Sequence, residues 1–146
     1  MAKNAPTAVT ALLTAVIGLG SLFIACGSPG VGSSGVLAQG RLTMTEGDSA
    51  DLEHGLVGQP QNADVTFYTH DFINDAGMAP APGQVDKRAC VSALSTRHDT
   101  VKDVYELTAG SSVCMQTEEG HVAALRIDRL PGVGAPGVAF TYTVWR

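Results

Sequence analysis

A long uncharged run near the amino end limits how much of this 146-residue chain can join a folded domain. Lys3 is followed by an apolar segment, Ala8 to Ala25, that carries no charged side chain. A short basic start before an apolar stretch is typical of an export signal. At about 18 residues the run is also near the lower limit for a transmembrane helix, which needs roughly 17 to 25. The remaining sequence has room for one domain and not for two.

The uncharged run leads directly into a cysteine, in the order Leu22-Phe23-Ile24-Ala25-Cys26. This ending resembles the lipobox of bacterial lipoproteins, in which the thiol receives a diacylglyceryl group and a peptidase cuts just before the cysteine. The resemblance implies that residues 1–25 are a signal peptide and that Cys26 is the lipidated first residue of the mature chain. Phe23 departs from the family pattern, because Leu, Val or Ile is usual at that position.

The alternative is that residues 8–25 remain as an uncleaved membrane span. Both interpretations place residues 27–146 on the extracytoplasmic face of the cell membrane. They differ only in whether a lipid or a membrane-spanning helix anchors the chain. One acyl chain binds a bilayer only reversibly, whereas two or three hold a protein there, at about 0.8 kcal/mol per buried methylene.

The chain has three cysteines, and an odd number in an exported protein requires a role for the extra one. A lipidated Cys26 supplies that role, and we then expect Cys90 and Cys114 to form a disulfide in an oxidising compartment. Closing a loop of about 25 residues would stabilise the fold by roughly 3 kcal/mol. Two buried free thiols are the alternative, and neither a C-x-x-C motif nor a zinc-type cysteine spacing is present.

Beyond Cys26 the sequence changes from a flexible composition to an alternating one. Glycine and serine dominate up to about Gly40, so we expect residues 26–39 to be a lipid-anchored tether and residues 40–146 to be the β domain. Apolar residues then recur at every second position, which indicates strands with one buried face. Such pairs and runs occur at Leu42 and Met44, at Val65 and Phe67, and at Val138, Phe140, Tyr142 and Val144.

The remaining patterns also favour a small all-β fold, an antiparallel β-sandwich or barrel. Residues 113–117 and 121–127 read as two strands, and Gly120 can take the left-handed conformation that closes a hairpin between them. Frequent glycine and proline exclude long helices. One short helix is expected between Lys87 and Arg97, because its small and apolar residues recur three and four apart.

The run from Leu107 to Ile127, with Cys90 upstream, resembles small extracytoplasmic β domains of actinobacterial lipoproteins and membrane-anchored proteins. The matching positions are Leu107, Gly110, Val113, Cys114, Thr117, Gly120, Val122, Ala123, Leu125 and Ile127. These are turn, disulfide and core positions, so the resemblance implies a fold and assigns no functional residue.

Two short segments carry residues capable of chemistry. Asp51, Glu53 and His54 lie close together in sequence, and His70 precedes Asp71. On a strand Asp51 and Glu53 would share a face while His54 points away, so we interpret this segment as a solvated acidic loop. No nucleophile elbow, Ser-x-x-Lys pair or phosphate-binding glycine loop is present. We therefore expect no catalytic residue, metal or cofactor.

The net charge of the expected mature chain makes some classes of binding partner unfavourable. Loss of Lys3 with the signal peptide would leave 8 basic and 14 acidic residues, a net charge of -6 that disfavours nucleic acid and anionic lipid. We expect a non-catalytic binding or interaction module, not an enzyme, with an envelope protein or glycan as partner. One alternative is a cell-envelope enzyme or metal-binding protein that uses His54 or His70 with nearby carboxylates, and the enzyme could also use His121. The other is an accessory subunit of a membrane complex.

Replacing Cys26 tests the anchor. The Cys26→Ala variant should leave the membrane fraction for the medium, or accumulate as an uncleaved precursor, because it cannot be lipidated. Cell fractionation and intact mass provide the measurement. Fractionation and mass equal to those of the wild type would contradict the lipobox interpretation.

Overall fold

The computed structural model describes residues 35–96, 101 and 103–146, so Cys26 and the expected signal peptide lie outside the described residues. The described part is mostly β-structure, in two antiparallel sheets, with a short α-helix. This confirms the expected all-β class and, more narrowly, a small sandwich. None of the helices in the described residues is long and apolar enough to cross a membrane.

The larger sheet has five strands in the order β1-β9-β8-β7-β6. Its strands are β1 (Val36–Met44), β9 (Val138–Trp145), β8 (Val122–Arg129), β7 (Ser112–Gln116) and β6 (Met78–Ala81). The C-terminal strand β9 lies between β1 and β8 and pairs along its length with both. The strand predicted from the alternation at residues 138–144 is therefore confirmed.

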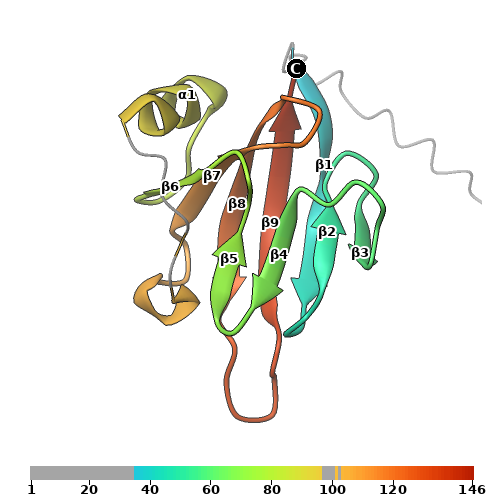
Figure 1. The fold of residues 1–146 in the computed structure, drawn as a ribbon. Helices are drawn as coiled ribbons and strands as arrows, with labels where there is room; N and C mark the ends of the chain where they lie inside the picture. Colours follow the sequence, from blue (N-terminus) through green and yellow to red (C-terminus); the bar gives the residue numbers. More distant parts are fainter. Residues whose placement is uncertain (1–34, 97–100, 102) are drawn as a thin grey trace, which may run out of the picture. The chain divides into compact units, whose positions relative to one another are not determined.

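The smaller sheet has four strands in the order β3-β2-β4-β5 and packs over the inner face of the larger one (Figure 1). Its strands are β2 (Ser49–Asp51), β3 (Leu56–Gly58), β4 (Val65–Tyr68) and β5 (Asp71–Ile73). The two sheets share one core, in which the rings of Phe72 and Phe140 meet edge to face at 6.2 Å. Such aromatic pairs contribute about 0.5 to 1.5 kcal/mol beyond the area they bury.

Helix α1 (Lys87–Thr96) contacts β6, β7 and β8 on the outer face of the larger sheet, and a 3₁₀ helix, η1 (Val104–Glu106), precedes β7. The helix begins where expected, since the Asp86 carboxylate accepts the Ala89 N–H at 2.7 Å as a cap. Cys90 of α1 and Cys114 of β7 form a disulfide, as the cysteine count predicts. Both are fully buried in a small cluster with Ala79 and Ala124.

The hairpin between β7 and β8 is confirmed, with its turn at the expected residues. The Thr117 N–H donates to the His121 carbonyl at 2.8 Å, and the Gly120 N–H donates to the Thr117 carbonyl at 2.9 Å. Gly120 has a φ of +86°, which a side chain would strain. This turn carries Glu118 and Glu119 to one end of the sandwich, where the candidate site lies.

The predicted tether is too long at its C-terminal end. Strand β1 begins at Val36, within the segment that glycine and serine composition assigned to the tether, and Val36 pairs with Trp145. Leu37 and Ala38 pack against the core. Tertiary pairing with β9 outweighs the flexible local composition, because the strand can bury these apolar side chains and satisfy its backbone groups together.

Removing the disulfide should destabilise the domain markedly. The double variant Cys90→Ala with Cys114→Ala is expected to lose about 3 kcal/mol of unfolding free energy, because the cross-link restricts the unfolded chain. Urea unfolding of the full chain in detergent measures this, with Cys26→Ala as the control that should keep wild-type stability. A loss below about 1 kcal/mol would show that the helix is held by packing alone.

Candidate functional site

The turn between β2 and β3 directs two carboxylates inward. Asp51 ends β2, and its Oδ1 accepts the His54 N–H at 3.0 Å, which closes the turn. Leu52 is fully buried and fixes the turn to the core. Gly55 follows with a φ of +66°, and a Cβ there would lie 3.0 Å from the Tyr142 hydroxyl oxygen. The backbone of the turn is thus packed closely against β9.

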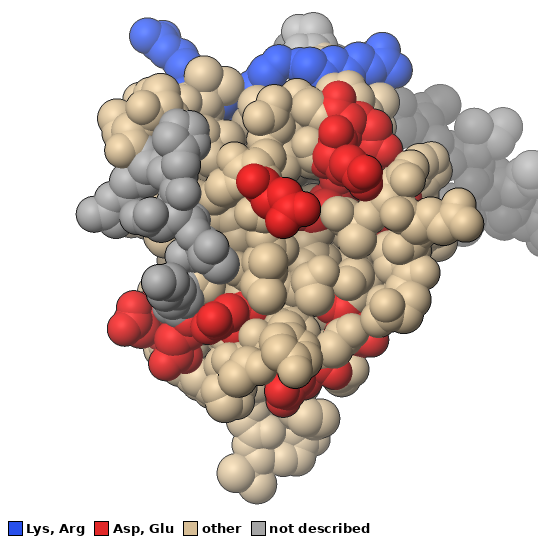
Figure 2. Space-filling model, in the orientation of Figure 1, with Lys and Arg blue, Asp and Glu red and all other residues tan. Residues whose placement is uncertain are grey.

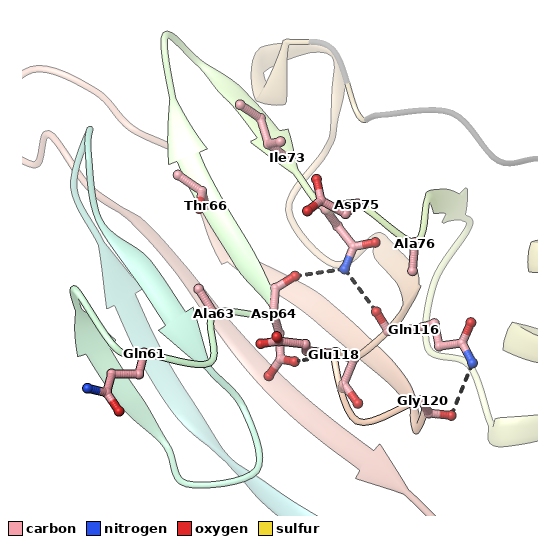
Figure 3. A pocket seen from close by; sticks show the side chains of 12 residues that line it. Gln61, Ala63, Asp64, Thr66, Ile73, Asp75, Ala76, Gln116, Glu118 and Gly120 are labelled. Carbon is pink, nitrogen blue, oxygen red and sulfur yellow. Dashed lines mark hydrogen bonds between the residues drawn. The ribbon is translucent and has the colours of Figure 1, made fainter.

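Asp64 connects this turn to the β7–β8 hairpin. Its Oδ2 accepts the Leu52 N–H at 2.7 Å, and its Oδ1 accepts the Glu118 N–H at 2.8 Å. Figure 3 shows the Asp64 carboxylate pointing toward Glu118 from the loop before β4. Asp64 is only 2% exposed, so one buried carboxylate joins three segments that are distant in sequence.

Glu53 completes a group of three buried carboxylates. One ligand oxygen each from Asp51, Glu53 and Asp64 lies within 4.8 Å of the other two. The Glu53 side chain is 8% exposed, and its Oε1 lies 3.1 Å from Nδ1 of His121. Its Oε2 has no hydrogen-bond partner among the residues that the structure describes. Buried polar atoms in proteins are nearly always paired, so this oxygen requires an explanation.

The closeness and burial of the three carboxylates raise the pKa values of nearby groups. Burial, together with the neighbouring Glu53 carboxylate, raises the pKa of Asp64 from 3.8 to about 6, although the N–H groups of Leu52 and Glu118 oppose the rise. Burial and the charges of Asp51 and Glu53 also raise the pKa of Tyr142. Negative charge is therefore costly at this position.

An open groove of about 630 Å³ lies beside the carboxylate group, between the β4–β5 side of the smaller sheet and the β7–β8 turn. Asn74 holds two sides of the groove together, because its Nδ2 donates to the carbonyls of Asp64 at 2.7 Å and Gln116 at 2.9 Å. Its polar lining includes Gln61, Asp64, Asn74, Asp75, Gln116 and Glu118. Neither a basic nor an aromatic side chain lines it among the described residues.

Acidic side chains also lie on the surface around the groove. In Figure 2 several separate groups of acidic side chains lie across the visible face, whereas the visible basic side chains lie along the end that carries the C-terminus. Asp75 and Glu118 are exposed at the groove. The groove therefore presents carboxylates and amides to solvent without local positive charge among the described residues.

The structure brings together some of the residues considered from sequence and separates others. His54 contacts the Asp51 carboxylate through Nδ1 at 2.9 Å, as close sequence spacing allows. His70 is not part of this group, since its ring meets the edge of Tyr105 at 5.1 Å between centroids. Cys26 lies outside the described residues, and the Cys90–Cys114 disulfide lies on the outer face of the larger sheet.

The interpretation of residues 51–54 as a solvated acidic loop is correct for His54, whose side chain is 63% exposed, and wrong for the carboxylates of Asp51 and Glu53. It assumed strand geometry through His54, but β2 ends at Asp51 and the chain turns at once, so strand alternation does not govern Glu53. Asp51 is 5% exposed and the Glu53 side chain 8%. Asp64 was missed altogether, because its partners are distant in sequence and no local pattern marks an aspartate as buried.

Comparison with known proteins adds nothing to this geometry: no protein-family model, curated protein or solved structure matches the chain.

The raised pKa of Asp64 has a defined effect on stability. Because the folded pKa of about 6 lies above 3.8, the folded chain binds this proton more tightly than the unfolded chain does. In metal-free buffer the unfolding free energy should therefore fall as pH rises from about 4 to about 6, and this contribution should then level off.

Urea unfolding across this pH range measures the effect. Asp64→Asn should flatten the slope, whereas Asp75→Asn, which removes an exposed carboxylate of the same groove, should keep it. A carboxyl NMR titration of Asp64 with a midpoint near the ordinary value of 3.8 would contradict the assignment.

Proposed function

We propose that the chain is an extracytoplasmic lipoprotein, anchored to the cell membrane through Cys26, whose β domain is a non-catalytic binding module. The observation that carries the binding role is the acidic groove beside Asp64, with its amide-rich lining and its lack of basic side chains among the described residues. The anchor rests on the lipobox-like sequence alone. The disulfide is consistent with an oxidising compartment.

The lining favours a ligand that carries positive charge and donates hydrogen bonds. Asp75 and Glu118 can pair with an ammonium or guanidinium group, and the amides of Gln61 and Gln116 can bind a peptide backbone. An uncharged glycan usually stacks on aromatic rings, and the groove has none among its described residues. We propose as ligand an exposed segment of an envelope protein containing lysine or arginine.

The enzyme alternative has less support. Asp64 has the raised pKa of a general acid, but both of its oxygens accept backbone N–H groups and it is 2% exposed. His54 and His70 have different partners, the Asp51 carboxylate and the Tyr105 ring. Of the histidines considered from sequence, His54 and His121 contact carboxylates of the group and His70 does not.

Titration with simple probes tests the groove. Deca-lysine and deca-arginine should shift the NMR signals of the Asn74 and Gln116 side-chain amides in the full chain in detergent, and deca-glutamate should not. Asp75→Asn and Glu118→Gln should each weaken binding about two- to fivefold at low salt, the usual range for an exposed ion pair.

Glu106→Gln is the matched control, since Glu106 is exposed and does not line the groove. It should bind the basic peptides as the wild type does, and added salt should weaken all variants. Equal weakening in Glu106→Gln would mean that only net charge matters. Groove shifts with a neutral oligosaccharide and none with the basic peptides would replace the proposed ligand by a glycan.

A further inference from the structure

The three buried carboxylates form a group of oxygens that no lysine or arginine side chain contacts among the described residues. Asp51, Glu53 and Asp64 supply the oxygens, and the contacts that they do make are with backbone N–H groups and two imidazole rings. Isolated buried carboxylates are strongly destabilising unless they are paired or bind a metal. Proximity alone would not identify a site, because acidic residues often cluster.

The Oε2 atom of Glu53 supports a cation site independently of the closeness of the three carboxylates. This oxygen is buried and has no hydrogen-bond partner among the described residues, although the other carboxylate oxygen contacts His121. It belongs to a side chain that is 8% exposed and that converges on the other two carboxylates. A buried acceptor without a partner, on one of three neighbouring carboxylates, is what a cation site without its cation would show.

The two histidines act as outer partners of the carboxylates. His54 contacts Asp51 and His121 contacts Glu53, each through Nδ1. Partners of this kind orient metal-binding side chains in known sites. The group of mutually close ligand atoms contains oxygens of the three carboxylates and no imidazole nitrogen, so the donor set is hard oxygen.

We propose that Asp51, Glu53 and Asp64 bind a Ca²⁺ ion. Hard oxygen ligands select Ca²⁺, Mg²⁺ or Mn²⁺ over zinc and copper. Two oxygens on opposite sides of Ca²⁺ are about 4.6 to 5.2 Å apart, since each lies about 2.3 to 2.6 Å from the ion. The three ligand oxygens lie within 4.8 Å of one another, which is close enough for one Ca²⁺ ion to contact all three. Mg²⁺ gives up its bound water reluctantly and usually binds only one or two protein carboxylates, so a group of three buried carboxylates favours Ca²⁺.

The ion would join the β2–β3 turn to the loop before β4, and through Asp64 it would fix the Glu118 turn. The site therefore has a structural role at the edge of the groove. It does not rest on the basic ligand proposed above, because Asp75→Asn, which should weaken that ligand, leaves all three carboxylates in place.

Thermal unfolding of the full chain in detergent tests the site. After EDTA treatment and buffer exchange, millimolar Ca²⁺ should raise the Tm by about 5 °C or more, because it binds the folded chain in preference to the unfolded one. Mg²⁺ should raise it less, and KCl at the same ionic strength should not reproduce the rise. A Tm that does not respond to Ca²⁺ overturns the proposal.

Glu53→Gln should abolish the Ca²⁺ response, and Glu119→Gln is the matched control that should keep it. Glu119 lies in the β7–β8 turn, is exposed, and is not one of the three carboxylates. An equal rise of the Tm in the Glu53→Gln variant would place the ion elsewhere and overturn the assignment.

Tb³⁺ luminescence in the wild type gives a readout that does not depend on a variant folding. Tb³⁺ occupies Ca²⁺ sites and emits when a nearby aromatic residue is excited. The Tyr142 hydroxyl packs against Gly55, in the same turn as Glu53, so it lies close to the proposed site. We expect emission on tyrosine excitation that Ca²⁺ displaces, and the absence of such emission overturns the proposal.

Discussion

The Asp64 carboxylate is the interaction on which this end of the sandwich depends. Its two oxygens accept N–H groups from Leu52 and Glu118, which belong to different sheets of the sandwich and to turns far apart in sequence. Breaking either bond would leave a backbone donor without its partner in a nearly dry environment, at a cost of about 1 to 3 kcal/mol. The link also shapes the groove, because Asp64 and Glu118 both line it.

The same link creates an electrostatic problem that the fold must resolve. Asp64 cannot move away from Glu53 without losing its backbone bonds, so the two acids remain close in a buried position. A proton on Asp64 resolves the repulsion at low pH, and a bound cation would resolve it at neutral pH. Either solution keeps the β2–β3 turn and the β7–β8 turn together, and the groove is built on both.

The fold was largely predictable from sequence because its signals are local. Alternation along residues 138–144 identifies β9, Gly120 identifies the hairpin turn, and the cysteine count identifies the Cys90–Cys114 pair. The start of β1 at Val36 was not predictable, since its residues lie beside a glycine-rich segment and form a strand only because β9 offers a partner.

The site was only partly predictable, because it is assembled across the sandwich. Asp51 and Glu53 stood out in sequence, but the turn after Asp51 removes the strand alternation that made them look exposed. His121 meets Glu53 across 68 residues, and Asp64 meets Glu118 across 54. No spacing rule connects positions so far apart, and a buried aspartate looks the same in sequence as a solvated one.

The proposed Ca²⁺ site predicts that a cation lies between the three carboxylates. A crystal structure of the full chain, grown with Ca²⁺ and measured with long-wavelength anomalous scattering, would show it. We predict an anomalous peak about 2.3 to 2.6 Å from oxygens of Asp51, Glu53 and Asp64. No peak there, with Glu53 and Asp64 in direct contact through a shared proton, would contradict the cation site.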